Sequence, residues 1–131
     1  MQNAKRGIQC RTLMRDYKKY DVWVKAHELT LLVYKHILIA LPKSEQFALT
    51  DQIKRAAYSV PLNIVEGCGR NTDKDFAHFL DMALGSLQEL EYCFLLAKDL
   101  AYIPEDLCQV VFEKTNELKA KLINLIKSIR Q

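Results

Sequence analysis

The sequence has 131 residues, of which 50% are hydrophobic and 27% charged, and a formal net charge of +3. This length and composition fit a single folded domain and exclude an intrinsically disordered chain. With only four glycines and three prolines, the chain lacks the regular turn signals that a sheet protein needs, which favours long helices with short connections.

Residues 1–19 show no hydrophobic periodicity and predict a flexible basic arm. Such an arm can bind the phosphates of RNA, although basic termini are also common as solvated tails. Met14 is an alternative translation start, which would remove the first three basic residues. Tyr17 and Tyr20 are available to stack on bases. The candidate nucleic-acid-binding residues are Lys5, Arg6, Arg11, Arg15, Lys18 and Lys19.

Residues 20–131 predict four helices, and the first runs from Asp21, as its N-cap, to Leu41. Pro42 stops this helix because its ring disfavours a helical residue before it. Leu31 and Leu38 lie off the main apolar stripe, so the helix is apolar over more of its circumference than one core contact requires. We expect another copy of the chain to cover this extra face.

The second helix is expected to begin after a cap at Ser44 and to contain the stretch DQIKRAAYSVPLNIVEGCGR, residues 51–70. Pro61 is expected to kink this helix without stopping it. Gly67 and Gly69 are expected to end it, because glycine permits the backbone turn that follows a helix.

The third helix should start at Thr72, as its N-cap, and run to about Tyr102. Gly85 in its middle suggests close contact with another helix. Pro104 suits the first position of a fourth helix that continues to the end of the sequence. The sequence therefore predicts an all-α fold, an antiparallel up-down-up-down four-helix bundle.

A polar stripe beside the apolar face of the second helix is the main candidate site. We consider it as a surface that binds RNA or a protein partner. The alternative is a network in which Arg55 and Glu66 bond to Glu89 or Glu91 of the third helix and fix helix register. The stripe and its partners on the third helix are Gln52, Arg55, Ser59, Asn63, Glu66, Arg70, Ser86 and Glu89.

Neither a cofactor nor a metal site is predicted. The pair Asp75 and His78 resembles half of a di-iron motif, but such bundles need two Glu-x-x-His pairs. The four cysteines have no CxxC spacing and are expected to be reduced, with Cys68 exposed in its glycine-flanked turn. Without a signal peptide or an apolar run long enough to span a bilayer, the protein is expected to be cytoplasmic.

Three phrases of the sequence resemble a known family. They are DYKKYDVWVKAHEL, LTDQIKRAAYSVPLNIVEGCGR and FAHFLDMALGSLQELEY, and they are similar to the four-helix-bundle proteins encoded within intervening sequences of bacterial 23S ribosomal RNA genes. The family pattern QxxRAAxSIxxNIAEGxGR is matched with two substitutions, Val60 for Ile and Val65 for Ala, and the later pattern GSxxELE is matched in full.

The resemblance, over about residues 14–103, implies a ring-shaped homo-oligomer, a pentamer, without enzymatic activity. The accessory variability proteins of diversity-generating retroelements resemble it in fold; they bind a reverse transcriptase and nucleic acid, and they are more basic than this chain. We therefore expect a non-enzymatic oligomeric scaffolding protein associated with RNA or a ribonucleoprotein. The alternative is an oligomeric adaptor that binds only protein. Neither a membrane nor a small-molecule substrate is expected.

Overall fold

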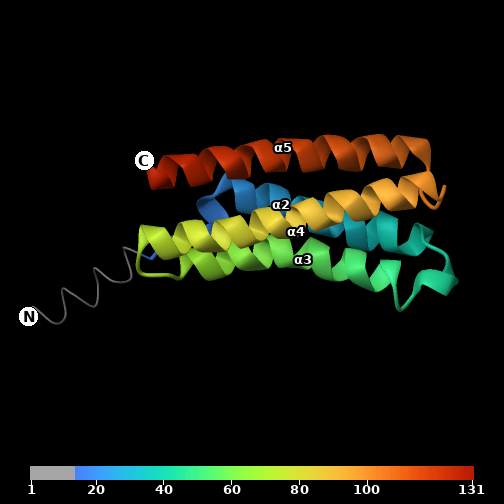
Figure 1. The fold of residues 1–131 in the computed structure, drawn as a ribbon, viewed down its shortest axis with the longest axis horizontal. Coiled ribbons are helices and arrows are strands. Elements are labelled where there is room, and N and C mark those ends of the chain that lie inside the picture. The colour runs from blue at the N-terminus through green and yellow to red at the C-terminus, as the bar shows by residue number, and fades with distance from the viewer. Residues whose placement is uncertain (1–13) are drawn as a thin grey trace, which may run out of the picture.

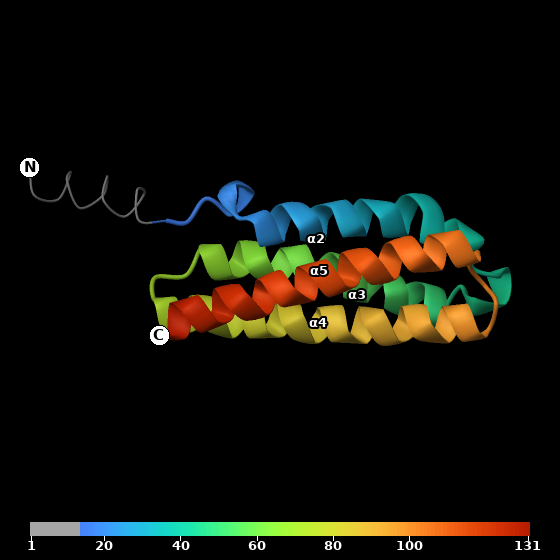
Figure 2. The same ribbon diagram turned by 90° about the horizontal axis from the view of Figure 1, so that it is seen from above.

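The computed structural model describes residues 14–131, which are all-α without strands (Figure 1). The four long helices are α2 (Asp21–Leu32), α3 (Leu49–Cys68), α4 (Asp73–Asp99) and α5 (Glu105–Arg130). Each packs on the next along the chain, and α5 also packs on α2. The α3–α4 turn and the C-terminus lie at one end, and the other two connections lie at the opposite end (Figure 2). The predicted four-helix fold is confirmed.

The core runs along the axis of the bundle and is built from one apolar stripe of each helix. The stripes follow from side chains spaced three and four residues apart, which share a face of an α-helix. Among residues 14–131, Thr115 is the one buried polar side chain, and its hydroxyl donates to the Val111 carbonyl at 2.7 Å. The largest fully buried side chains include Phe76, Phe94, Leu29, Ile37, Ile53, Ile64, Leu80 and Leu118.

The first helical run continues to residue 40 in three parts. After α2 come one π turn, η2 (Val33–Ile37), and one 3₁₀ turn, η3 (Leu38–Ala40), before Leu41 becomes extended ahead of Pro42. The predicted cap is wrong. Tyr20 holds the N-cap position without a side-chain bond, and Asp21 is the first helical residue. Its carboxylate pairs with Lys121 of α5 at 2.8 Å, which lowers the pKa of Asp21.

Ser44 does not cap α3, because it lies in a separate 3₁₀ turn, η4 (Lys43–Glu45). The helix begins at Leu49, after an N-cap at Ala48 that makes no side-chain bond. Glu45 supplies the missing acceptor, since one of its oxygens lies 3.4 Å from the Leu49 amide nitrogen. The other accepts the Tyr102 hydroxyl at 2.9 Å and joins the two connections at this end of the bundle.

The helix α3 continues through Pro61, as predicted. Proline has no N–H, so the carbonyl of Ala57 loses its helical donor. The hydroxyl oxygen of Thr30 on α2 lies 3.1 Å from this carbonyl oxygen and 2.8 Å from that of Ala26. The neighbouring helix therefore supplies a donor where the proline removes one.

The helix α4 begins as predicted, with Thr72 accepting the Asp75 amide at 3.1 Å, but it ends at Asp99, before Tyr102. Ala101 then has a φ of 58°, and the Tyr102 amide donates to the Ala97 carbonyl at 2.9 Å. This left-handed residue closes the helix in the way that glycine usually does. Pro104 was predicted at the first helical position of α5, but it is the N-cap residue, and the helix begins at Glu105.

Between residues 14 and 131, none of the helices combines the length and apolar character that crossing a membrane requires.

Candidate functional site

An open groove lies between the outward sides of α3 and α4. We call it the α3–α4 groove; its volume is about 310 Å³, and its polar lining comes mainly from the candidate site predicted above. The groove thus brings five of the eight predicted residues together, because they share one side of two adjacent antiparallel helices. Its lining residues are Gln52, Arg55, Ala56, Tyr58, Ser59, Ser86 and Glu89.

The floor of the groove is a small hydrogen-bonded cluster that joins the two helices. The hydroxyl oxygens of Ser59 and Ser86 are 2.8 Å apart. The side-chain amide of Asn63 donates to the Ser59 carbonyl at 2.8 Å and to the Ser59 hydroxyl oxygen at 3.0 Å. These half-buried groups satisfy one another, so the cluster fixes the register of α3 against α4.

The two charged residues of the groove remain exposed. Arg55 stands on α3 and Glu89 on α4, and neither forms a salt bridge within residues 14–131. The predicted network around Arg55 does not form inside the chain. Its other proposed members bond elsewhere, Glu66 to Arg70 at 3.7 Å and Glu91 to Lys119 at 2.7 Å.

Gly85 is next to this groove and faces outward. A Cβ atom added to it would meet nothing within 4 Å. The predicted close helix contact at Gly85 is therefore wrong within a single chain, where glycine only weakens the helix relative to alanine. The close approach occurs at Gly67, where an added Cβ would lie 2.9 Å from the Phe79 Cβ and 3.3 Å from the Phe76 carbonyl oxygen.

Arg15 ties the start of the described chain to the α3–α4 turn. Its guanidinium donates to the Arg70 carbonyl at 2.8 Å and to Asp73 at 2.5 Å, and it lies 4.3 Å from the centroid of the Phe76 ring. Sequence reasoning missed this contact, because no spacing rule relates residues 58 positions apart. The packed part of the chain thus extends before residue 20, and Arg15 is already engaged.

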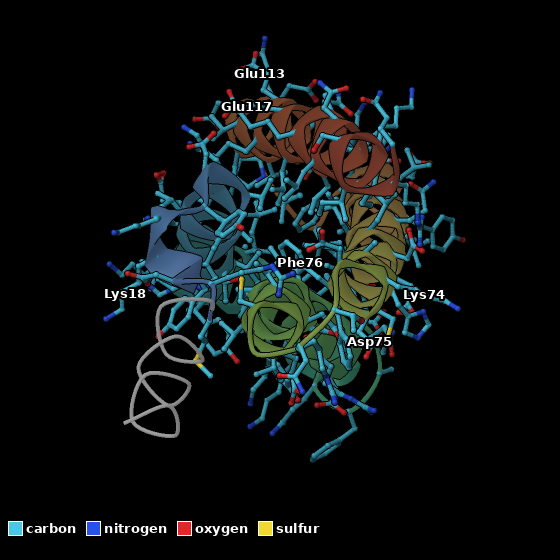
Figure 3. All side chains as sticks on the ribbon, turned by 90° about the vertical axis from the view of Figure 1, so that its left-hand side faces the viewer. Lys18, Lys74, Asp75, Phe76, Glu113 and Glu117 are labelled. Atoms are coloured by element: carbon cyan, nitrogen blue, oxygen red, sulfur yellow. The ribbon has the colours of Figure 1, made fainter. Side chains whose placement is uncertain are left out.

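Tyr17 of the predicted arm and Tyr20 directly after it also make contacts within the chain. Tyr17 meets Trp23 edge-on at 5.0 Å, and Tyr20 meets Phe76 edge-on at 5.6 Å between ring centroids. Lys18 and Lys19 are exposed, and Lys18 projects outward at the end of the bundle (Figure 3). The other basic residues predicted to bind nucleic acid, Lys5, Arg6 and Arg11, lie outside the described residues.

Three of the cysteines are free thiols buried in the bundle. The expectation of an exposed Cys68 is wrong: its exposed fraction is 1%, and burial raises its pKa from 9.0 to about 11. Burial also raises the pKa of Cys93 and of Cys108. Such thiols stay protonated at neutral pH and are poor nucleophiles. Within the described residues, the half-motif of Asp75 and His78 is not part of any group of three or more metal-binding side chains.

Comparison with known proteins identifies the family to which this chain belongs. No curated protein matches the chain. A solved structure from Bacteroides thetaiotaomicron VPI-5482, described as a protein with unknown function from the S23 ribosomal protein family, is 26% identical with a TM-score of 0.74. The match covers 81% of this chain and 95% of that one. Residues 18–124 match the family model described as 23S rRNA-intervening sequence protein. Since this match spans most of the chain, the protein belongs to the 23S rRNA-intervening sequence protein family.

Proposed function

We propose that this protein is a non-enzymatic, self-associating scaffold of the cytoplasm that associates with RNA or a ribonucleoprotein. The observation that carries the proposal is the amount of apolar surface left exposed on a completed bundle. Isolated exposed apolar residues are ordinary, but several on neighbouring helices are typical of an interaction surface. Those on the outward sides of α2, η2, α3 and α4 include Val24, Leu31, Tyr34, Tyr58, Leu62, Met82, Tyr92 and Leu95.

The resemblance to ring-forming bundle proteins supports a closed homo-oligomer, and we propose five subunits. A ring would cover the exposed apolar side chains of each copy and repeat every binding surface around an axis. Such repetition strengthens weak contacts by avidity without requiring a strongly basic chain.

We propose a non-enzymatic role because the candidate nucleophiles, the serine hydroxyls of the groove and the buried cysteine thiols, are not activated. The hydroxyls of Ser59 and Ser86 bond to each other instead of to a general base. The buried thiols have raised pKa values, whereas a catalytic cysteine needs a lowered one. The α3–α4 groove offers charge and hydrogen bonds, which suits binding.

For the RNA contact we propose Lys18 and Lys19 together with the arm residues Lys5, Arg6 and Arg11. The two lysines are exposed at the end of the bundle where the described chain begins. The name of the matched family refers to 23S rRNA, and that of the Bacteroides relative's family refers to the ribosome. Contacts of this kind neutralise phosphates and carry little sequence preference.

A gel-shift titration with RNA tests this contact. Affinity should fall by roughly tenfold or more between about 50 and 200 mM salt. It should also fall in a variant carrying Lys18→Glu and Lys19→Glu. A control carrying Lys43→Glu and Lys54→Glu makes the same change in net charge elsewhere on the bundle. Equal losses in both variants, or no dependence on salt, would contradict a contact at the arm.

The second candidate function is a protein-only adaptor. It is favoured by the engagement of Arg15, Tyr17 and Tyr20 in contacts within the chain, which removes one cation and two stacking rings from the arm. The absorbance of the purified protein distinguishes the two candidate functions. A scaffold bound to RNA should show a raised ratio of absorbance at 260 nm to that at 280 nm that falls after a high-salt wash, and an adaptor should not.

A further inference from the structure

The outward side of α2 and η2 forms a convex ridge with a regular pattern. Val24, Glu28, Leu31 and Lys35 follow one another at steps of three or four residues, so they lie on one line along the helix. Val24 and Leu31 are 36% and 40% exposed, and Tyr34 beside them is 41% exposed. We call this line the α2 ridge.

The two charges of the α2 ridge are without opposite partners in the described chain. Glu28 and Lys35 are exposed, and neither forms a salt bridge within residues 14–131. The same is true of Arg55 and Glu89 in the α3–α4 groove. The ridge therefore carries one acidic and one basic residue, Glu28 and Lys35. The groove carries one basic and one acidic residue, Arg55 and Glu89, so the charges of the two surfaces can be matched.

Gly85 provides an independent indication that another backbone approaches the groove. A glycine in the middle of a helix costs about 1 kcal/mol relative to alanine, and here the space for a Cβ is empty. No contact within the described residues offsets this cost. It is explained if a helix of another molecule passes close to α4 at this point, where a side chain would hold it away.

We propose that the α2 ridge of one copy seats in the α3–α4 groove of the next copy. Glu28 would then face Arg55, and Lys35 would face Glu89, with Leu31 between them against Tyr58. This inference rests on the proposed self-association and names the surfaces that carry it.

Shape favours this pairing over groove against groove. A convex ridge fills a concave surface at the packing density that interfaces require, whereas two facing grooves enclose a void. The pairing also covers the exposed apolar side chains of α2 and of the groove in one contact.

The contact joins two different surfaces, so a pair of copies keeps one free groove on one copy and one free ridge on the other. A contact of this kind propagates around an axis and closes into a ring when the rotation per subunit divides a full turn. Two-fold pairing would use the same surface on both copies and would stop at a dimer.

Charge reversal with rescue tests the proposal in the full-length protein. Glu28→Arg and Arg55→Glu each place like charges in contact and should raise the dissociation constant of the assembly by roughly tenfold or more. The double variant restores the pair in reversed order and should regain most of the affinity. Glu113→Arg is the matched control, because Glu113 projects from α5 on the far side from α3 (Figure 3). Masses are measured by sedimentation velocity, with circular dichroism to verify folding.

The outcomes separate this inference from the proposed self-association. Weakened assembly in both single variants, with rescue in the double variant and no effect of Glu113→Arg, supports the ridge-in-groove contact. An assembled wild-type protein whose two single variants assemble equally well overturns the contact and leaves self-association standing. A wild-type protein that stays monomeric overturns both.

Discussion

At the scale of single residues, one contact between α2 and α3 replaces a hydrogen bond that a proline removes. Pro61 deprives the Ala57 carbonyl of its helical donor, and the hydroxyl of Thr30 lies within hydrogen-bond distance from the adjacent helix. This pairing lets α3 keep a proline in its interior without leaving a buried acceptor unsatisfied.

A double-mutant cycle on Thr30 and Pro61 measures the compensation. Thr30→Val should lower the free energy of unfolding by about 1 kcal/mol, because the Ala57 carbonyl then lacks a donor. In a Pro61→Ala background the loss should be smaller, since the backbone amide that alanine restores at this position can donate to the same oxygen. Chemical denaturation at one fixed protein concentration gives all four values. Equal losses of unfolding free energy in the two backgrounds would show that the Thr30 hydroxyl does not compensate for the donor that Pro61 removes.

The burial of Cys68 predicts a pH dependence of stability. Its pKa rises on folding from 9.0 to about 11, so the folded chain holds this proton more tightly than the unfolded chain. The contribution is complete below about pH 9 and is lost as the pH rises through about 11. The free energy of unfolding should therefore fall over this range by about 2 kcal/mol more in the wild type than in Cys68→Ala.

The raised pKa values of Cys93 and Cys108 are common to both proteins and cancel in the comparison. The pKa of Tyr20 is raised by burial and further by the charge of Cys68, so its change in the variant reports on the same thiol. Parallel stability curves for wild type and variant would mean that the thiol titrates as it does in water.

At the scale of elements, α3 and α4 cross closely beside their turn. Gly67 lets the Phe76 and Phe79 side of α4 approach the α3 backbone. Arg15 lies over Phe76 at 4.3 Å, and Arg70 lies over Phe79 at 4.5 Å between guanidinium carbon and ring centroid. The turn is thus held by a small residue inside and by two guanidinium groups outside.

Two matched substitutions test this crossing. Gly67→Ala should lower the free energy of unfolding by about 1–3 kcal/mol, because its Cβ would lie 2.9 Å from the Phe79 Cβ. Gly69→Ala should change it by less than about 0.5 kcal/mol, because its φ is −83° and its Cβ would have only ordinary contacts. Thermal or chemical unfolding of the wild type and both variants gives these differences in the free energy of unfolding. Similar effects at the two positions would contradict a close crossing at Gly67.

The elements themselves could be predicted from sequence because helical periodicity is local. The same periodicity placed Arg55, Ser59, Ser86 and Glu89 on facing sides of two helices, and the groove brings them together. The ends of the helices were harder to predict. Ala101 adopts a left-handed conformation that glycine usually takes, and the Leu49 amide is capped by Glu45, four residues earlier, instead of by the N-cap residue. The Arg15 contact could not be predicted, because it depends on where distant segments meet.

At the scale of the whole molecule, the bundle is complete in its core yet leaves apolar side chains on several outward faces. Among residues 14–131, no side chain covers Leu62, Tyr92 or the α2 ridge. Repeated copies would cover these residues and would bring several basic arms together, which is how a mildly basic chain can hold a polyanion.

The thermal stability of this protein should therefore depend on its concentration. For a self-associating chain, the midpoint of thermal unfolding rises with protein concentration, because assembly stabilises the folded state by mass action. A midpoint that is constant over a hundredfold range of concentration would contradict assembly.

The most direct test of this account is the molar mass of the native protein in solution. Size-exclusion chromatography with light scattering at micromolar concentration should give a particle several times the 15.2 kDa of one chain, with five chains as the proposed number. A single species of one chain's mass would contradict self-association and every function proposed here that depends on it.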